Sequence, residues 1–177
     1  MQLNVKSFIE RGGTYFPNNS IVSRRADGSL FRYNYGAMEK RVRRVSSQLQ
    51  RLGVKPGDRL ATLAWNTYRH YELYFAIPCA GAVLHTVNLR LTDEHIAYII
   101  NKAEDSLVFV DPDLLPVLER LADQLPTVKG YVVLADELPE TTLSPVYGYE
   151  QLVAEGDEAY QFPELDENSL AGMCFTS

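Results

Sequence analysis

Two hydroxyl side chains, those of Thr176 and Ser177, follow the apolar segment "AGMCF" at the end of the sequence. Hydroxyl groups help to bind anions such as phosphate when glycine backbone N–H groups and a lysine lie beside them. The apolar residues of the segment predict a buried strand with both hydroxyls at its carboxyl end. We therefore expect Thr176 and Ser177 to lie beyond the carboxyl end of a strand, where ligands of a parallel sheet usually bind.

Other polar side chains follow apolar runs that are typical of parallel strands. Trp65 and Asn66 follow one run, Asn88 follows a second and Asp111 follows a third. Ligands of an open parallel sheet bind beyond the carboxyl ends of its strands, so these residues are candidates for ligand contact. Asn66 can instead cap the next helix, and Asp111 stands before a proline, where aspartate commonly starts a turn. We favour these structural roles for Asn66 and Asp111.

His85 stands near the end of an otherwise apolar strand, where it needs a hydrogen-bond partner. A satisfied histidine of the core or of an interface is favoured over a direct ligand contact. The aromatic side chains nearby recur largely at helical spacing, which favours core packing, and their excess suits a subunit or domain contact. They are Trp65, Tyr68, Tyr71, Tyr74 and Phe75. His85, Asn88 and Trp65 are thus candidates for an interface or for a position near a ligand.

The sequence contains no recognisable catalytic motif: no nucleophile with a base at motif spacing, no GxGxxG and no complete Walker sequence. We therefore name no catalytic residue in this chain. The three histidines lack the spacing of metal ligands, so no metal site is predicted. Cys79 and Cys174 stand far apart in apolar surroundings, which predicts reduced, buried thiols.

The elements that must position these residues begin with a hairpin and a long helix. Asp27-Gly28 separates two short strand-like runs and predicts a tight primed turn. Apolar residues at intervals of three and four then predict a helix over 35–52, capped by Asn34 and ended by Gly53. The basic segment "EKRVRRV" lies on the polar side of this helix, which favours a solvated face over a phosphate-binding patch.

Strand and helix patterns alternate from residue 60 to residue 134, and the strands are too apolar for burial on one side only. This alternation predicts an α/β fold, with a mostly parallel sheet, helices on both of its faces and a short N-terminal β-hairpin. The stretch from Asp136 to Glu167 is rich in Pro, Asp and Glu and predicts a loop. At 177 residues, we expect one domain.

The composition is that of an ordinary globular protein, with 46% hydrophobic and 23% charged residues. A net charge of -6 argues against nucleic acid as a partner. There is no run of 18 apolar residues and no secretory signal pattern. We therefore expect a cytoplasmic protein without a transmembrane segment.

Read in order, the sequence resembles the adenylate-forming (AMP-binding) superfamily, and within it the acyl-CoA synthetases of medium- and long-chain fatty acids. The most specific match is "LGVKPGDRLATLAWNTYRHYELYFAIPCAGAVLHTVNLRLTDEHIAYIINKAEDSLVFVD", followed by the terminal "DENSLAGMCFTS". The resemblance covers essentially the whole chain and is weakest between Leu134 and Asp166. In that family the last segment continues into G-T-T-G-x-P-K-G, a loop that wraps the phosphates of ATP.

The resemblance implies a fatty acid–CoA ligase that uses ATP, Mg²⁺ and CoA, of which residues 1–177 form an incomplete N-terminal α/β subdomain. Thr176 and Ser177 would begin the ATP phosphate loop. In this family a carboxylate attacks the α-phosphorus of ATP, and CoA then displaces AMP from the acyl-adenylate. The other groups that the family uses come later in its chains, so we expect no ligase activity from these residues alone.

Two other hypotheses remain open. A non-catalytic interaction module of α/β fold would use this region for a homodimer contact or for binding to the remainder of a ligase chain. The stretch "LHTVNLRL" and the aromatic side chains could serve either role. A small-ligand-binding α/β domain that happens to share the pattern is the third and least favoured hypothesis.

Overall fold

The computed structural model describes residues 3–176, and a six-stranded parallel sheet forms its centre. The strand order is β7-β6-β5-β3-β4-β8. The strands are β3 (Arg59–Leu63), β4 (Val83–Thr86), β5 (Leu107–Val110), β6 (Tyr131–Val133), β7 (Val146–Gly148) and β8 (Gly172–Cys174). The predicted parallel α/β fold is confirmed.

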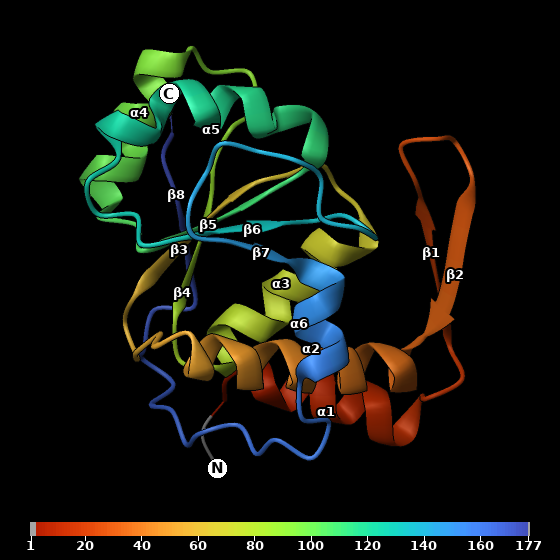
Figure 1. The fold of residues 1–177 in the computed structure, drawn as a ribbon. Helices are drawn as coiled ribbons and strands as arrows, with labels where there is room; N and C mark the ends of the chain where they lie inside the picture. The colour runs from red at the N-terminus through yellow and green to blue at the C-terminus, as the bar shows by residue number, and fades with distance from the viewer. Residues whose placement is uncertain (1–2, 177) are drawn as a thin grey trace.

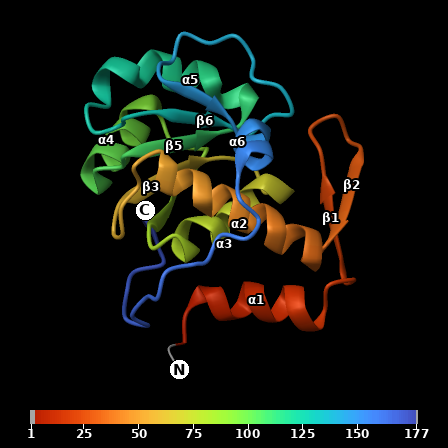
Figure 2. The ribbon, with the colours of Figure 1, turned by 60° about the horizontal axis from the view of Figure 1, so that its bottom comes forward.

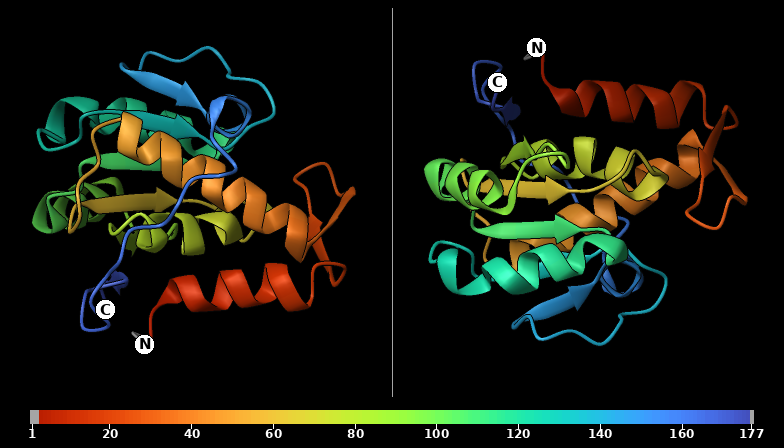
Figure 3. Two further views of the ribbon diagram at one scale, coloured as in Figure 1. Left: turned by 90° about the horizontal axis from the view of Figure 1, so that it is seen from below. Right: turned by 90° about the horizontal axis from the view of Figure 1, so that it is seen from above.

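Helices cover both faces of the sheet (Figure 1). One face packs against α2 (Tyr35–Arg51), α3 (Tyr68–Cys79) and α6 (Tyr149–Glu155), and α1 (Val5–Tyr15) packs in turn against α2 and α3. The other face packs against α4 (Asp93–Ala103) and α5 (Leu115–Leu121), which the 3₁₀ turns η1 (Pro112–Leu114) and η2 (Ala122–Gln124) flank. Figure 1 shows these layers from the side, with α4 and α5 above the sheet and α2 and α1 below it, and Figure 3 shows the sheet from its two faces. The apolar strands are therefore buried from both sides.

The periodic helix predicted over 35–52 is α2, and its apolar stripe lies in the core. The Asn34 side chain accepts a hydrogen bond from the Ala37 N–H, as expected of an N-cap. Gly53 follows with a φ of +83°, a left-handed conformation that glycine adopts without a steric penalty. Local sequence signals therefore fix both ends of this helix.

The hairpin of β1 (Ser20–Arg24) and β2 (Leu30–Asn34) projects beside the main sheet (Figures 1 and 2). The predicted primed turn is wrong. Gly28 has a positive φ whereas Asp27 does not, and the Gly28 N–H donates to the Arg25 carbonyl. A longer turn with one left-handed glycine joins the strands, because five residues separate them.

Two predictions about the last third of the chain are wrong. The segment 136–167, predicted as a loop, contains β7 and α6, because short elements that tertiary packing stabilises carry little periodic signal. The segment "AGMCF" does form a strand, β8, but that strand is an exposed edge of the sheet. Cys174 is accordingly an exposed thiol, whereas Cys79 is buried as predicted.

Among residues 3–176, no helix combines the length and the apolar character that crossing a membrane requires.

Candidate functional site

The carboxyl edge of the sheet gathers several of the candidate residues, as the parallel pairing requires. Trp65 follows β3, Asn88 follows β4, Asp111 follows β5 and Thr176 follows β8. The helix after β3 lies on one face, whereas the helices after β4 and β5 lie on the other. Such reversals open crevices at a sheet edge, so the edge around Trp65 is the place where the fold favours a ligand.

Trp65 and Asp111 form one hydrogen-bonded unit across the ends of β3 and β5. The Trp65 backbone N–H donates to Asp111 Oδ2 over 2.6 Å, and its indole N–H donates to Asp113 Oδ2 over 2.9 Å. Burial raises the pKa of the Asp111 carboxyl to about 6, although the bond from Trp65 opposes the shift. Asp111 thus accepts a bond from a neighbouring strand and makes no side-chain cap to the next helix. The predicted turn role holds, since the Leu114 N–H donates to the Asp111 carbonyl.

A cavity of about 600 Å³ opens beside this unit. Its walls come from the hairpin turn, from the start of α3 and from the segments after β5 and β6. Arginines and aspartates both line it, namely Arg24, Arg25, Arg69, Asp27, Asp111, Asp113 and Asp136. The charges therefore nearly balance, and the cavity favours neither an anion nor a cation.

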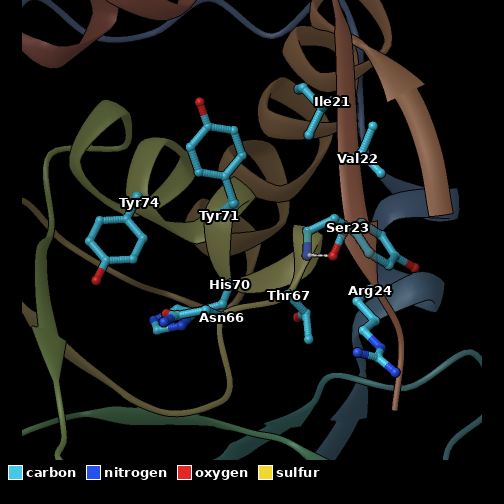
Figure 4. Close-up of a pocket in the computed structure, with 10 residues that line it drawn as sticks. Ile21, Val22, Ser23, Arg24, Asn66, Thr67, His70, Tyr71 and Tyr74 are labelled. Carbon is cyan, nitrogen blue, oxygen red and sulfur yellow. Dashed lines mark hydrogen bonds between the residues drawn. The ribbon is translucent and has the colours of Figure 1, made fainter. Parts of the chain in front are cut away.

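A second cavity, of about 430 Å³, lies between β1 and the first half of α3 (Figure 4). We call it the tyrosine pocket. Its lining consists of Ile21, Val22, Ser23, Arg24, Asn66, Thr67, Tyr68, His70, Tyr71 and Tyr74. Burial lowers the pKa of the His70 imidazole, which lies close to Thr62 Oγ1 and to the Trp65 carbonyl. The exposed tyrosines that the sequence assigned to core packing thus form a wall of this pocket.

His85 lies away from both cavities, fully buried in the sheet. Its Nδ1 is 2.6 Å from Oδ2 of the equally buried Asp105, while Nε2 has no hydrogen-bond partner among the described residues. Its ring lies 5.4 Å from that of Phe175, between centroids. The favoured interpretation of a core histidine agrees with this burial, and its partner Asp105 carried no signal in the sequence.

The remaining candidates are spread along the edge. Thr176 is the residue after Phe175 and is exposed. Ser177 lies outside the described residues. Asn88 is exposed, and its side-chain oxygen accepts a bond from the Arg90 N–H over 3.0 Å. Since β3 and β8 flank β4, Trp65 and Thr176 follow strands on opposite sides of His85, and the candidates do not form one cluster.

Sequence reasoning missed a buried ion network between α2, α3 and α6. Arg41 donates to Glu72 over 2.8 Å and to both carboxylate oxygens of Glu150, while Tyr149 donates to Glu72 over 2.7 Å. Burial raises the pKa of Glu72 even though Arg41 lowers it. For Glu150, bonds from Arg41 and Arg69 outweigh the effect of burial and lower the pKa.

This network corrects the interpretation of "EKRVRRV" as a solvated face. Arg41 and Arg43 are mostly buried and form ion pairs, because α1 and α6 pack over the side of α2 that carries them. Helical periodicity shows which residues share a face and does not show what packs on that face.

Within residues 3–176, no group of three or more acidic, histidine or cysteine side chains is arranged to hold a metal ion. We assign no residue of this chain to Mg²⁺.

Comparison with known families places this geometry in context. The family described as AMP-binding enzyme matches residues 10–177. A medium-chain-fatty-acid–CoA ligase of Ectopseudomonas oleovorans is 38% identical over 99% of this chain and 33% of its own length. A long-chain-fatty-acid–CoA ligase of Thermus thermophilus is 41% identical over 99% of this chain and 31% of its own. The chain thus spans about a third of the length of these curated relatives.

Solved structures show the same fold. A long-chain-fatty-acid-CoA ligase from Archaeoglobus fulgidus superposes with a TM-score of 0.86 at 14% identity, over 99% of this chain and 35% of that one. An anthranilate CoA ligase in complex with anthranoyl-AMP superposes with a TM-score of 0.84 at 17% identity, over 97% and 32%. At these identities the likeness concerns the fold alone.

Proposed function

Because the chain belongs to the family of AMP-binding enzymes, we propose that it is the N-terminal third of an ATP-dependent fatty acid–CoA ligase. The observation that carries the proposal is the similarity to fatty acid–CoA ligases at 38 and 41% identity over 99% of the chain. In the proposed reaction, a fatty carboxylate oxygen attacks the α-phosphorus of ATP and pyrophosphate leaves. The CoA thiolate then attacks the acyl carbon and AMP leaves.

In this proposal the segment after β8 begins the binding site for the phosphates of ATP, with Thr176 and Ser177 as its first hydroxyl donors. Support comes from the position of Thr176, which follows a parallel strand at the carboxyl edge, and from its exposure. In this proposal His85, Trp65 and Asn88 contribute to the site through their positions near it and their packing against neighbouring residues. Mg²⁺ would be held by residues outside this chain, since no described cluster suits it.

The proposal includes the remainder of a ligase chain as the partner of residues 1–177, and a cytoplasmic location. Electrostatic stabilisation of the transferring phosphoryl group needs cationic groups that two hydroxyls do not replace. Residues 1–177 alone are therefore inactive in the proposal. Sequencing of the gene downstream of codon 177 tests whether the remainder of a ligase chain follows. Codons for glycines and a lysine are expected there, and a stop codon would contradict this part of the proposal.

The decisive assay is ATP–pyrophosphate exchange by the full-length protein with and without octanoate. Octanoate-dependent exchange is expected, and its absence with every fatty acid from butyrate to palmitate would refute the ligase proposal. Thr176→Val should raise KM for ATP roughly tenfold, the typical worth of one hydrogen bond to a charged group. Thr176→Ser keeps the hydroxyl and is the matched control.

A non-catalytic interaction module is the second candidate, because α1 and its flanks expose large apolar side chains. Leu3, Phe8, Tyr15 and Phe16 are 46 to 77% exposed. Such patches mark contact surfaces more often than single exposed residues do. Light scattering decides: a homodimer that Phe8→Ser and Tyr15→Ser dissociate would support this role, and a monomer at every concentration would exclude it.

A further inference from the structure

A buried histidine–aspartate pair lies next to the carboxyl end of β8. His85 and Asp105 are both 0% exposed, and Nδ1 of His85 is 2.6 Å from Oδ2 of Asp105. Asp105 stands between α4 and β5, so the contact joins the loop after α4 to β4 although β3 lies between the two strands. The orientation of the imidazole is therefore fixed by a side chain that is as deeply buried as His85 itself.

The pair is not arranged for stability alone. Nε2 of His85 and Oδ1 of Asp105 are both buried, and neither has a hydrogen-bond partner within residues 3–176. Buried polar atoms normally have partners, and apolar side chains of similar volume often stabilise a core better than a buried ionic pair does. Local departures of this kind are expected where a residue has a functional role besides packing.

The imidazole packs against the residue that precedes Thr176. In the register of β4 and β8, His85 pairs with Met173, and paired residues project to the same face of a sheet. Residues two apart along an extended segment also share a face, which places Phe175 on the side of His85. The two rings lie 5.4 Å apart between centroids, at an angle of 54°. Phe175 is 37% exposed, so its ring is in part covered by the protein and in part in contact with solvent.

The backbone around Phe175 has little other support. β8 is three residues long and pairs with β4 alone, and Cys174 and Thr176 on either side of Phe175 are exposed. One aromatic contact changes a local equilibrium about two- to tenfold. For a segment with so few contacts, an effect of this size is enough to decide how often Thr176 occupies its place at the sheet edge.

We propose that His85 is a positioning residue, which holds Phe175 and thereby places Thr176 at the carboxyl edge of the sheet, while Asp105 fixes the orientation of the imidazole. The consequence for ATP rests on the proposed function, in which Thr176 is the first hydroxyl donor to the phosphates. His85 and Asp105 touch no ligand themselves, because both are buried. Loss of the ring contact should therefore weaken ATP binding and leave fatty acid binding unchanged.

Amide hydrogen exchange of the 177-residue chain tests the positioning without ATP. Phe175→Leu is the first variant, because a partly exposed residue beyond the end of a strand can be changed without loss of the core. Exchange at residues 172–176 should become about two- to tenfold faster, while exchange in β6 stays as in the parent. Unchanged exchange at 172–176, or an equal increase in β6, would overturn the proposal.

A double-variant cycle tests whether His85 acts through Phe175. Asn at position 85 keeps an amide near the place of Nδ1 for the bond to Asp105 and removes the rest of the ring. His85→Asn should also speed exchange at 172–176 relative to β6, and the double variant with Phe175→Leu should add nothing, since both changes remove one contact. Additive effects would refute the coupling. His95→Asn is the matched control, because His95 is an exposed histidine of α4.

ATP–pyrophosphate exchange by the full-length protein gives a second readout. Phe175→Leu and His85→Asn should each raise KM for ATP about two- to tenfold, with kcat and KM for octanoate within about twofold of the parent. A merely structural role would instead lower the amount of active enzyme and leave KM for ATP unchanged. That result would contradict the positioning role of His85.

The two readouts separate the role of His85 from the ligase proposal. Faster hydrogen exchange at 172–176 in the variants, in a protein whose full-length form catalyses no pyrophosphate exchange, would retain His85 as the residue that holds the segment and remove the ligase. Pyrophosphate exchange by a protein whose variants show unaltered hydrogen exchange would retain the ligase and refute the role of His85.

Discussion

The two ends of the sheet are held in different ways. At the β7 end, α2, α3 and α6 are joined by the network around Arg41, whose partner Glu72 is 0% exposed. At the β8 end, a three-residue strand pairs with β4 alone, and Cys174 and Phe175 are exposed. Segments that change during catalysis are commonly drawn from the less stable parts of a fold. The proposed phosphate segment follows the more exposed edge.

The largest effect should follow from breaking the network. Arg41→Met leaves the Glu72 carboxylate buried with the Tyr149 hydroxyl as its remaining hydrogen-bond donor within residues 3–176, which should cost about 3 to 5 kcal/mol of unfolding free energy. Urea unfolding at pH 7 measures it. The double variant Arg41→Met/Glu72→Met should recover most of the loss, and a double variant no more stable than the single one would argue against an uncompensated charge as the cause.

Truncation of a buried side chain compares the two ends directly. Leu63→Ala on central β3 should cost about 2 to 5 kcal/mol, because Leu63 is fully buried. Met173→Ala on β8 should cost less than about 1 kcal/mol, since its side chain is only half-buried. Urea unfolding of both variants checks this. Equal losses would show that the β8 edge is as firmly packed as the centre.

The buried carboxyl of Asp111 should make the free energy of unfolding depend on pH. Its pKa is about 6 in the folded protein against an ordinary 3.8, so the folded state binds this proton more tightly. The stability that this bound proton gives to the folded state is fully present below about pH 4 and is lost as the pH rises through about 6. Asp111→Asn mimics the protonated form and still accepts the Trp65 N–H. It should match the parent near pH 4 and exceed it at pH 7 by up to about 3 kcal/mol.

Circular dichroism unfolding at pH 4 and pH 7 measures this difference. Asp113→Asn is the control, because Asp113 is an exposed aspartate of the same segment whose partner is the exposed indole of Trp65. A difference between Asp111→Asn and the parent that does not change with pH would contradict the assigned titration.

The smallest change in stability is expected at the surface ion pair of Lys6 and Glu164, in which Nζ lies 2.7 Å from Oε1. Water and salt screen exposed pairs. Glu164→Gln should therefore leave the unfolding midpoint indistinguishable from that of the parent, in contrast to Arg41→Met. A clear loss would show that α1 depends on this contact.

Much of the fold was predictable, because its signals are local. The stripe of α2, the cap at Asn34 and the apolar runs of β3 to β6 each lie within one stretch of sequence. The short elements β7 and α6 were not predictable, since β7 is held by pairing with β6 and α6 by packing against α2. Exposure of β8 was also missed, because an apolar run indicates a strand and does not show its place in the sheet.

The sequence by itself determined the alternation of elements, and with it the edge at which Trp65, Asn88, Asp111 and Thr176 lie, because parallel strands share one direction. The tertiary structure alone decided which polar groups meet. Arg41 and Glu150 stand 109 residues apart, and Asp105, just before β5, reaches His85 of β4 although β3 lies between these two strands. It also brought the hairpin against α3 to form the tyrosine pocket. Periodicity reports the face on which a side chain lies, whereas its partner depends on how distant elements pack.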